Sequence, residues 1–278
     1  MQKKQTESVS VLKNAMFYVN LLFMQNVKWI SHFVNAIIKG DRLLNIEPIA
    51  KIYTVFPEKF GIPRQSGLVE HSIGRIVFEK KYRNVLAIKG LEEFSHLWLI
   101  WEFSKSNVNS EKFVPMVHPP KLGGESKKGV FATRSPFRPN KLGLSSVKIL
   151  KIDTNCNESP VIYVSGIDIL SGTSIYDIKP YIPYTDCHTD ASEGYTKDTK
   201  NKTINVLFEK DFSGFISENV KKALIEVLRQ DPRAAYNKKE DYIYGMAFKE
   251  FDVRFIVKNN VLRVVDLCYR DADFKEIK

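Results

Sequence analysis

Residues 131–145 have the sequence FATRSPFRPNKLGLS, in which two arginines, Arg134 and Arg138, stand four residues apart between prolines and a glycine. Each proline fixes one backbone φ angle and removes one amide donor, which makes the loop stiff. Residues 130–133 and 144–150 have the apolar composition of strands. We therefore expect a rigid polar loop that joins two strands and holds two guanidinium groups in place.

A guanidinium group held in this way suits a carboxylate or a phosphate, because its planar fork can bind two oxygens at once. The alternative is an ordinary strand connection whose arginines pair with nearby carboxylates. The residues of the loop leave both interpretations open.

The composition is that of an ordinary globular protein with an excess of basic residues. The 278 residues are 44% hydrophobic and 27% charged, and the formal net charge is +10. This charge favours a polyanionic partner such as RNA, DNA or anionic lipid, although a basic protein can also carry it without such a partner. The three cysteines and five histidines are scattered, so we expect neither disulfides nor a metal site. No clean export signal is present, and we expect a cytoplasmic protein.

The chain divides into three parts by its hydrophobic pattern. Apolar residues recur at helical spacing within residues 1–45, which predicts an N-terminal helical extension, but polar residues interrupt every window long enough to span a membrane. We expect no stable membrane insertion. Residues 46–203 contain many short apolar runs separated by Gly/Pro loops, which favours an antiparallel barrel or a strongly curved sheet.

Residues 204–278 predict a small α+β domain. Ser217 is a good N-cap for a helix that must end before Pro232, and strands are expected over 242–248, 252–257 and 262–267. The predicted fold class is therefore mainly β with an α+β part: a β-barrel followed by a small C-terminal domain.

Several loops occur in an order that is typical of one protein family. They are 59–65 (KFGIPRQ), 94–98 (FSHLW), 129–140 (GVFATRSPFRPN), 177–181 (DIKPY), 190–192 (DAS) and 230–233 (QDPR). With these motifs the chain resembles the TsaA-like tRNA methyltransferases, also called the TrmO family, over about residues 46–267. The segment before residue 46 lies outside the resemblance.

The resemblance implies a methyltransferase that uses S-adenosylmethionine to methylate N6 of threonylcarbamoyladenosine, the modified base beside the tRNA anticodon. It also implies an antiparallel β-barrel cofactor domain and a homodimer with the cofactor near the interface. No Gly-x-Gly-x-x-Gly motif follows a strand, so the doubly wound methyltransferase sheet is not expected.

The resemblance also assigns candidate site residues by position. The cofactor contacts fall on Pro63, Arg64, Gln65, Ser104, Lys105, Arg134, Leu144, Asp168, Ile169, Leu170 and Ser171. We expect Arg64 or Arg134 to hold the methionyl carboxylate, and Asp168 or nearby backbone groups to meet polar cofactor atoms. Family members often carry His-Gln where this chain has Ser104-Lys105, which is a departure from the family pattern.

Two further groups of residues are assigned to catalysis and to tRNA. Asp177 is the candidate general base or orienting group, with Lys179 and Tyr181 shaping the pocket; the alternative is a structural Asp177–Lys179 pair. The candidates for tRNA contacts are Arg138, Lys141, Asp231, Arg233 and Tyr236. Ala234 replaces a proline common in the family.

Two other functions fit the same residues. One is a non-catalytic RNA-binding barrel that has lost its cofactor, which the Ser104-Lys105 departure suggests. The other is a methyltransferase that acts on a different small acceptor.

Overall fold

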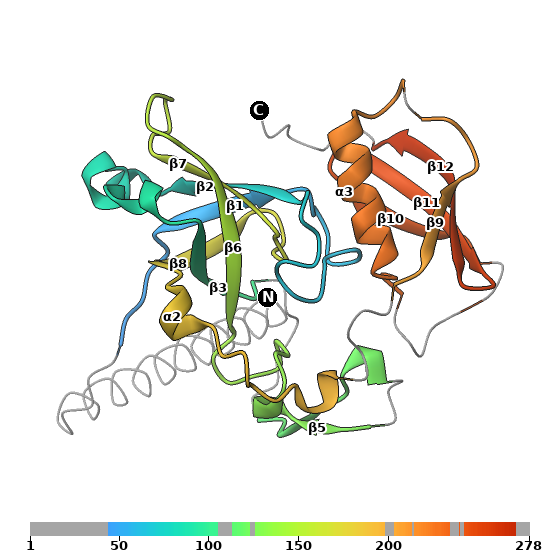
Figure 1. Cartoon of the computed structure of the whole chain (residues 1–278), viewed down its shortest axis with the longest axis horizontal. Helices are drawn as coiled ribbons and strands as arrows, with labels where there is room; N and C mark the ends of the chain where they lie inside the picture. The colour runs from blue at the N-terminus through green and yellow to red at the C-terminus, as the bar shows by residue number, and fades with distance from the viewer. Residues whose placement is uncertain are drawn as a thin grey trace, which may run out of the picture. The chain divides into compact units, whose positions relative to one another are not determined.

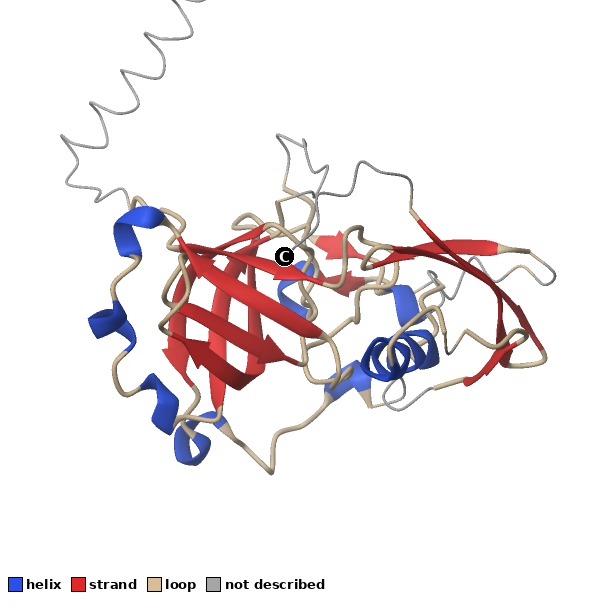
Figure 2. Cartoon of the chain, turned by 90° about the horizontal axis from the view of Figure 1, so that it is seen from above, coloured by secondary structure: helices blue, strands red, loops and turns tan. Residues whose placement is uncertain are grey.

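The computed structural model describes residues 44–104, 113–122, 126–197, 203–212, 214–233, 239 and 242–270. Backbone contacts divide the chain into two units, residues 1–46 and 47–278, and every described helix and strand belongs to the second. The helices predicted within residues 1–45 fall outside the described residues. Most of the described chain is strand and loop (Figure 2).

Six strands close into an antiparallel barrel, which confirms the predicted fold class (Figure 1). In their order around the barrel they are β1 (Ala50–Thr54), β2 (Ile73–Phe78), β7 (Val161–Ser165), β6 (Leu142–Asp153), β3 (His96–Glu102) and β8 (Thr173–Pro180), which pairs again with β1. Closure leaves none of these strands at an open sheet edge. Inward-facing aliphatic side chains such as Ile52, Ile76, Leu97 and Leu99 are fully buried and fill the interior.

Short helices and one pair of short strands lie between and after the barrel strands. The 3₁₀ helices are η1 (Lys80–Tyr82), η2 (Val85–Ile88), η3 (Leu91–Glu93), η4 (Pro120–Leu122), η5 (Val130–Ala132) and η6 (Gly194–Thr196). The strands β4 (Met116–Val117) and β5 (Lys128–Gly129) pair with each other between β3 and β6. The helix α2 (Pro183–Asp186), like η6, follows the last barrel strand, β8.

One strand prediction at the arginine loop is wrong. Residues 130–133 were expected to be extended, but they contain η5, because both the amide and the hydroxyl of Thr133 donate to the carbonyl of Val130. The arginine loop therefore joins a 3₁₀ turn to β6 rather than one strand to another. Periodicity in a window of four residues cannot separate these two structures.

The C-terminal domain is a four-stranded sheet with one helix. Its elements are β9 (Asn205–Phe208), α3 (Glu218–Arg229), β10 (Tyr244–Phe248), β11 (Phe251–Lys258) and β12 (Val261–Tyr269), with sheet order β10-β11-β12-β9. The predicted N-cap is confirmed, since the Ser217 side chain accepts the amide of Val220. The parallel strand β9 was not predicted. Asn259 and Asn260 both have positive φ, as a tight hairpin turn between β11 and β12 requires.

The segment that follows β1 packs into the hydrophobic core of the C-terminal domain. Val55 and Phe56 pack with the buried face of α3 and with the C-terminal sheet. The amide of Lys249 donates to the carbonyl of Val55 at 2.8 Å. The C-terminal domain therefore braces the loop at residues 59–65, whose Phe60 ring stacks on Phe255 at a centroid distance of 6.4 Å.

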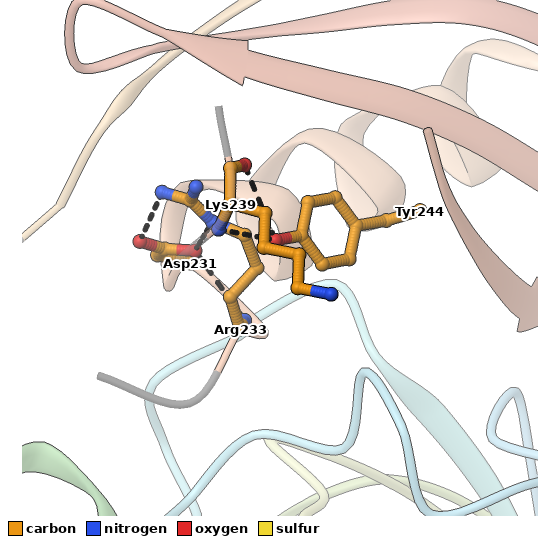
Figure 3. Close-up of polar contacts among 4 residues, drawn as sticks. All are labelled: Asp231, Arg233, Lys239 and Tyr244. Atoms are coloured by element: carbon orange, nitrogen blue, oxygen red, sulfur yellow. Dashed lines mark hydrogen bonds and ion pairs between the residues drawn. The ribbon is translucent and has the colours of Figure 1, made fainter. Parts of the chain in front are cut away.

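The loop after α3 is fixed by a buried ion pair (Figure 3). The Arg233 guanidinium donates to both carboxylate oxygens of Asp231, at 2.8 and 3.0 Å, and the two side chains are only 7% and 11% exposed. Asp231 has a φ of +47° and also accepts the backbone amide of Arg233. The Arg233 guanidinium lies over the ring of Tyr244, whose hydroxyl contacts the backbone of Lys239.

We expect Arg233→Ala to destabilise the protein by about 3 kcal/mol, because it leaves the Asp231 carboxylate buried without its guanidinium partner. Urea unfolding followed by circular dichroism measures this change. The exposed Arg263 of β12 provides a control, and Arg263→Ala should shift stability by less than about 0.5 kcal/mol. Equal stabilities for the two variants would show that the ion pair has no structural role.

Candidate active site

A cavity of about 510 Å³ lies where β3, β6 and the loops at residues 59–65 and 133–138 meet. It brings together most of the predicted cofactor contacts: Pro63, Arg64, Gln65, Ser104, Arg134, Leu144, Asp168 and Leu170. These residues come from five separate segments of the chain. Their convergence on one cavity is what a shared ligand site requires.

Two described cofactor candidates, Ile169 and Ser171, do not line this cavity. Lys105 lies outside the described residues. The Ile169 side chain is fully buried in the barrel core, and its carbonyl accepts the hydroxyl of Thr54 at 2.9 Å. The Ser171 hydroxyl accepts the amide of Thr54 at 3.1 Å. Ile169 and Ser171 therefore fix the backbone on either side of Leu170 without facing the cavity.

A hydrogen-bonded chain of side chains connects the barrel interior with the cavity. The Trp101 indole donates to the Ser145 hydroxyl at 3.0 Å, and Ser145 donates to the Asp168 carboxylate at 2.6 Å. Gly143 faces Trp101 across the β3–β6 pairing, and a Cβ atom there would lie 2.3 Å from the indole. A glycine is therefore needed for the indole to lie flat over β6 and reach Ser145.

The Asp168 carboxyl group is the most strongly perturbed acid of the cavity. Burial raises the pKa of Asp168 from 3.8 to about 6. The Ser145 hydroxyl, backbone amides and the charge of Arg134 lower this pKa but do not offset the burial. At neutral pH the site therefore holds a carboxylate with less than its full hydration, which is a suitable partner for a cationic or hydroxyl-bearing ligand.

The two arginines of the loop have different tasks. Arg134 is exposed and donates to the side-chain oxygen of Gln65, across the cavity mouth. Arg138 donates to the carbonyls of Thr133 at 3.0 Å and Ser135 at 3.4 Å. Arg138 thus braces the loop from within, while the exposed Arg134 side chain reaches Gln65 of the neighbouring loop.

Glu102 is an acidic residue of the cavity that no sequence motif indicated. The Tyr176 hydroxyl donates to its carboxylate at 2.6 Å, and this hydrogen bond, with burial, raises the pKa of Tyr176 to about 12. The contact depends on an irregularity in the β3–β8 pairing, where Trp101 pairs with Ile175 and Ile100 with Asp177. Such a bulge re-aims a side chain, and no sequence signal marks it.

The predicted catalytic residues lie together at the end of β8, away from the cavity lining of their own chain. Lys179 forms an ion pair with Asp177 at 2.8 Å, which raises the pKa of Lys179. The Tyr181 ring lies 5.5 Å from that of Trp98. The predicted roles of Asp177, Lys179 and Tyr181 in catalysis stay predictions.

The predicted tRNA contacts are dispersed over the structure. Arg138 lines the cavity, and Lys141 is half-buried where the arginine loop enters β6. Asp231 and Arg233 are occupied with each other in the buried pair, so in this arrangement they shape their loop and do not offer a guanidinium to a phosphate. Tyr236 and Ala234 lie outside the described residues.

Within the described ranges, no helix is long and apolar enough to cross a membrane. The same residues contain no group of three or more His, Cys, Asp or Glu side chains that could hold a metal ion.

We expect the difference in stability between the wild type and Asp168→Asn to change between about pH 4 and 6. The raised pKa means that folded Asp168 binds a proton in this window while the unfolded chain does not, so the contribution of Asp168 to wild-type stability falls as pH rises through it. Above pH 6, Asp168→Asn should be the more stable protein by about 1–3 kcal/mol. Urea unfolding at several pH values tests this, and two parallel pH curves would contradict it.

Comparison with known proteins identifies the family of this fold and cavity. Residues 51–187 match the family model of the tRNA-methyltransferase O N-terminal domain, and residues 202–269 match that of the TrmO C-terminal domain. The tRNA (adenine(37)-N6)-methyltransferase of Escherichia coli strain K12 is 36% identical over 219 residues, which are 76% of this chain and 92% of that protein.

Further relatives agree. A putative S-adenosylmethionine-dependent methyltransferase of Pseudomonas aeruginosa, RcsF, is 34% identical over 82% of this chain and 99% of its own length. The crystal structure of TrmO from P. aeruginosa superposes with a TM-score of 0.65 at 31% identity, covering 82% of this chain and 97% of that one. The chain described here therefore belongs to the tRNA-methyltransferase O (TrmO) family.

Proposed function

We propose that this chain is an S-adenosylmethionine-dependent tRNA methyltransferase that methylates N6 of threonylcarbamoyladenosine beside the anticodon. The observation that carries the proposal is the cavity at the barrel end, where Arg64, Arg134 and Asp168 converge in a chain of the TrmO family. The relatives' names support an adenine N6 acceptor in tRNA. A tRNA substrate and three widely spaced cysteines also support a cytoplasmic location.

The residues of the cavity fit S-adenosylmethionine. Its volume of about 510 Å³ is in the range of cofactor sites. Arg64 and Arg134 offer guanidinium groups to the methionyl carboxylate, and Asp168 offers an acceptor to the ammonium or hydroxyl groups. The adenine ring needs an apolar wall, which comes from Leu142, Leu144 and Leu170.

Bound S-adenosylmethionine supplies a methyl group activated by its attachment to a sulfonium sulfur. When bound, it would pass this methyl group to N6 of the acceptor, which would release one proton. The tasks of the protein are to align N6, the methyl carbon and the sulfur, and to receive that proton. The N6 lone pair is delocalised into the carbamoyl group, so loss of the proton assists the reaction.

We assign the proton-accepting or N–H-orienting role to Asp177. We propose that Asp177 of one copy of the chain acts at the cavity of a second copy. Asp177 pairs with Ile100 of β3, and Ile100 pairs with Leu144 of β6. Leu144 is 54% exposed, so Asp177 lies beside an outward apolar strip that a homodimer would cover. Because Leu144 also lines the cavity, covering this strip brings one copy's β8 toward its partner's cavity.

We expect Arg134→Ala to raise the Kd for S-adenosylmethionine by about tenfold or more, through loss of a charge-assisted hydrogen bond. Isothermal titration calorimetry measures the affinity, and Arg134→Lys tests whether the fork matters in addition to the charge. The control Arg263→Ala should bind as the wild type does. Unchanged affinity in folded Arg134→Ala would remove Arg134 from the site. No binding to the wild type would favour the non-catalytic RNA-binding barrel.

We expect Asp177→Asn to slow methyl transfer by about a hundredfold with little change in cofactor affinity, because it removes a proton acceptor. A single-turnover assay on threonylcarbamoyl-modified tRNA measures the rate. Lys151 and Asp153 form a matched control, an ion pair at the same spacing on β6 with a distance of 3.1 Å. Asp153→Asn should leave the rate unchanged.

The same variants test the shared site. If Asp177 acts on the partner's cavity, mixing Asp177→Asn with Arg134→Ala chains should restore activity, since mixed dimers contain one intact site. Full single-turnover activity of Asp177→Asn would end its assignment as the base.

A further inference from the structure

Three phenylalanines before and within the arginine loop are exposed. The exposed fractions are 56% for Phe113, 70% for Phe131 and 51% for Phe137. The rings of Phe113 and Phe131 are stacked with centroids 5.9 Å apart and planes 24° apart. Two exposed rings in contact, Phe113 and Phe131, point to a binding partner more than scattered single side chains do.

The backbone holds these rings in fixed positions. β4 and β5 pair with each other, and the amide of Val130 donates to the carbonyl of Pro115 at 2.8 Å. Val130 itself is buried, with 1% exposure, so η5 is anchored by one residue and presents the next, Phe131, to solvent. A side chain that is already ordered loses little conformational entropy when a ligand stacks on its ring.

The exposed rings are continuous with the proposed active site. Phe131 precedes the cavity residues Thr133 and Arg134, and Phe137 lies between the cavity residues Pro136 and Arg138. A ligand that fills the cavity and extends beyond its mouth on this side therefore meets these rings.

The charge of this segment selects an anionic ligand. Residues 113–141 contain six basic residues, Lys121, Lys127, Lys128, Arg134, Arg138 and Lys141, and one acidic residue, Glu125. The ammonium group of Lys128 lies 5.8 Å from the centre of the Tyr195 ring. Aromatic rings interleaved with cations are the usual surface for single-stranded nucleic acid, whose bases stack while its phosphates pair with the charges.

We propose that Phe113, Phe131 and Phe137 form a stacking platform for unpaired anticodon-loop bases that flank the methylated adenosine. Lys127 and Lys128 contact the phosphates of the same nucleotides. This inference rests on the proposed function, since it concerns the same RNA. A second copy of the chain is the less suitable occupant of this platform. A twofold contact would place the basic segments of the two copies against each other, and their like charges would repel.

The test is the affinity for a labelled synthetic anticodon stem-loop RNA, measured by fluorescence anisotropy. Phe131→Ala should raise the Kd by roughly five- to a hundredfold, since stacking on one base contributes an effect of this size. Phe131→Leu, which keeps the apolar area but not the ring, should lose affinity as well, whereas Phe131→Trp should retain it. Leu86→Ala is the control, because Leu86 is an apolar side chain of similar exposure, 76%.

Several results would overturn the platform. They are an affinity of Phe131→Ala within about twofold of the wild type, or wild-type affinity of Phe131→Leu. A change from dimer to monomer in Phe131→Ala, seen by light scattering, would instead assign the surface to a second copy. Cofactor titration and methylation assays separate the platform from the proposed function. If the wild type methylates tRNA and the Phe131 variants bind RNA as the wild type does, only the platform is refuted. A wild type that binds neither cofactor nor RNA refutes both.

Discussion

The buried carboxylate of Asp168 is the constraint around which the cavity is built. It lies at the end of a hydrogen-bonded chain from Trp101 through Ser145, and that chain exists because Gly143 leaves room for the indole. Each member restricts the next: the indole fixes the hydroxyl, and the hydroxyl fixes the carboxylate. A carboxylate so fixed can select a ligand group without first reorganising itself, which is the benefit of a preorganised polar site.

The barrel holds the site residues in place, and the loops contribute most of the charged side chains of the cavity. A closed sheet has no strand edge to fray, so the residues at its end are held by the whole ring of strands. The C-terminal domain also supports the loop at residues 59–65, which contains Arg64, since Phe60 of this loop stacks on Phe255. This division explains how a β-barrel can carry a function that other methyltransferases perform on doubly wound sheets.

Two arginines four residues apart take opposite roles because of what surrounds them. Arg138 turns toward the carbonyls of its own loop, while Arg134 turns toward Gln65 and the cavity. The Asp231–Arg233 pair shows a similar result in the C-terminal domain, where burial commits an arginine to structure. Residue type therefore sets what a side chain can bind, and local packing sets whether it is available.

The sequence alone determined the family, the mainly β class and the helix start at Ser217, because loop motifs and caps are local signals. It also placed eight of its eleven cofactor candidates in segments that meet at the cavity. It could not determine that residues 130–133 form a 3₁₀ turn, that β9 adds a parallel strand, or that a bulge turns Tyr176 toward Glu102. It also assigned Arg233 to RNA although that side chain is buried. These outcomes depend on contacts between residues far apart in the chain, which tertiary structure decides and local patterns do not contain.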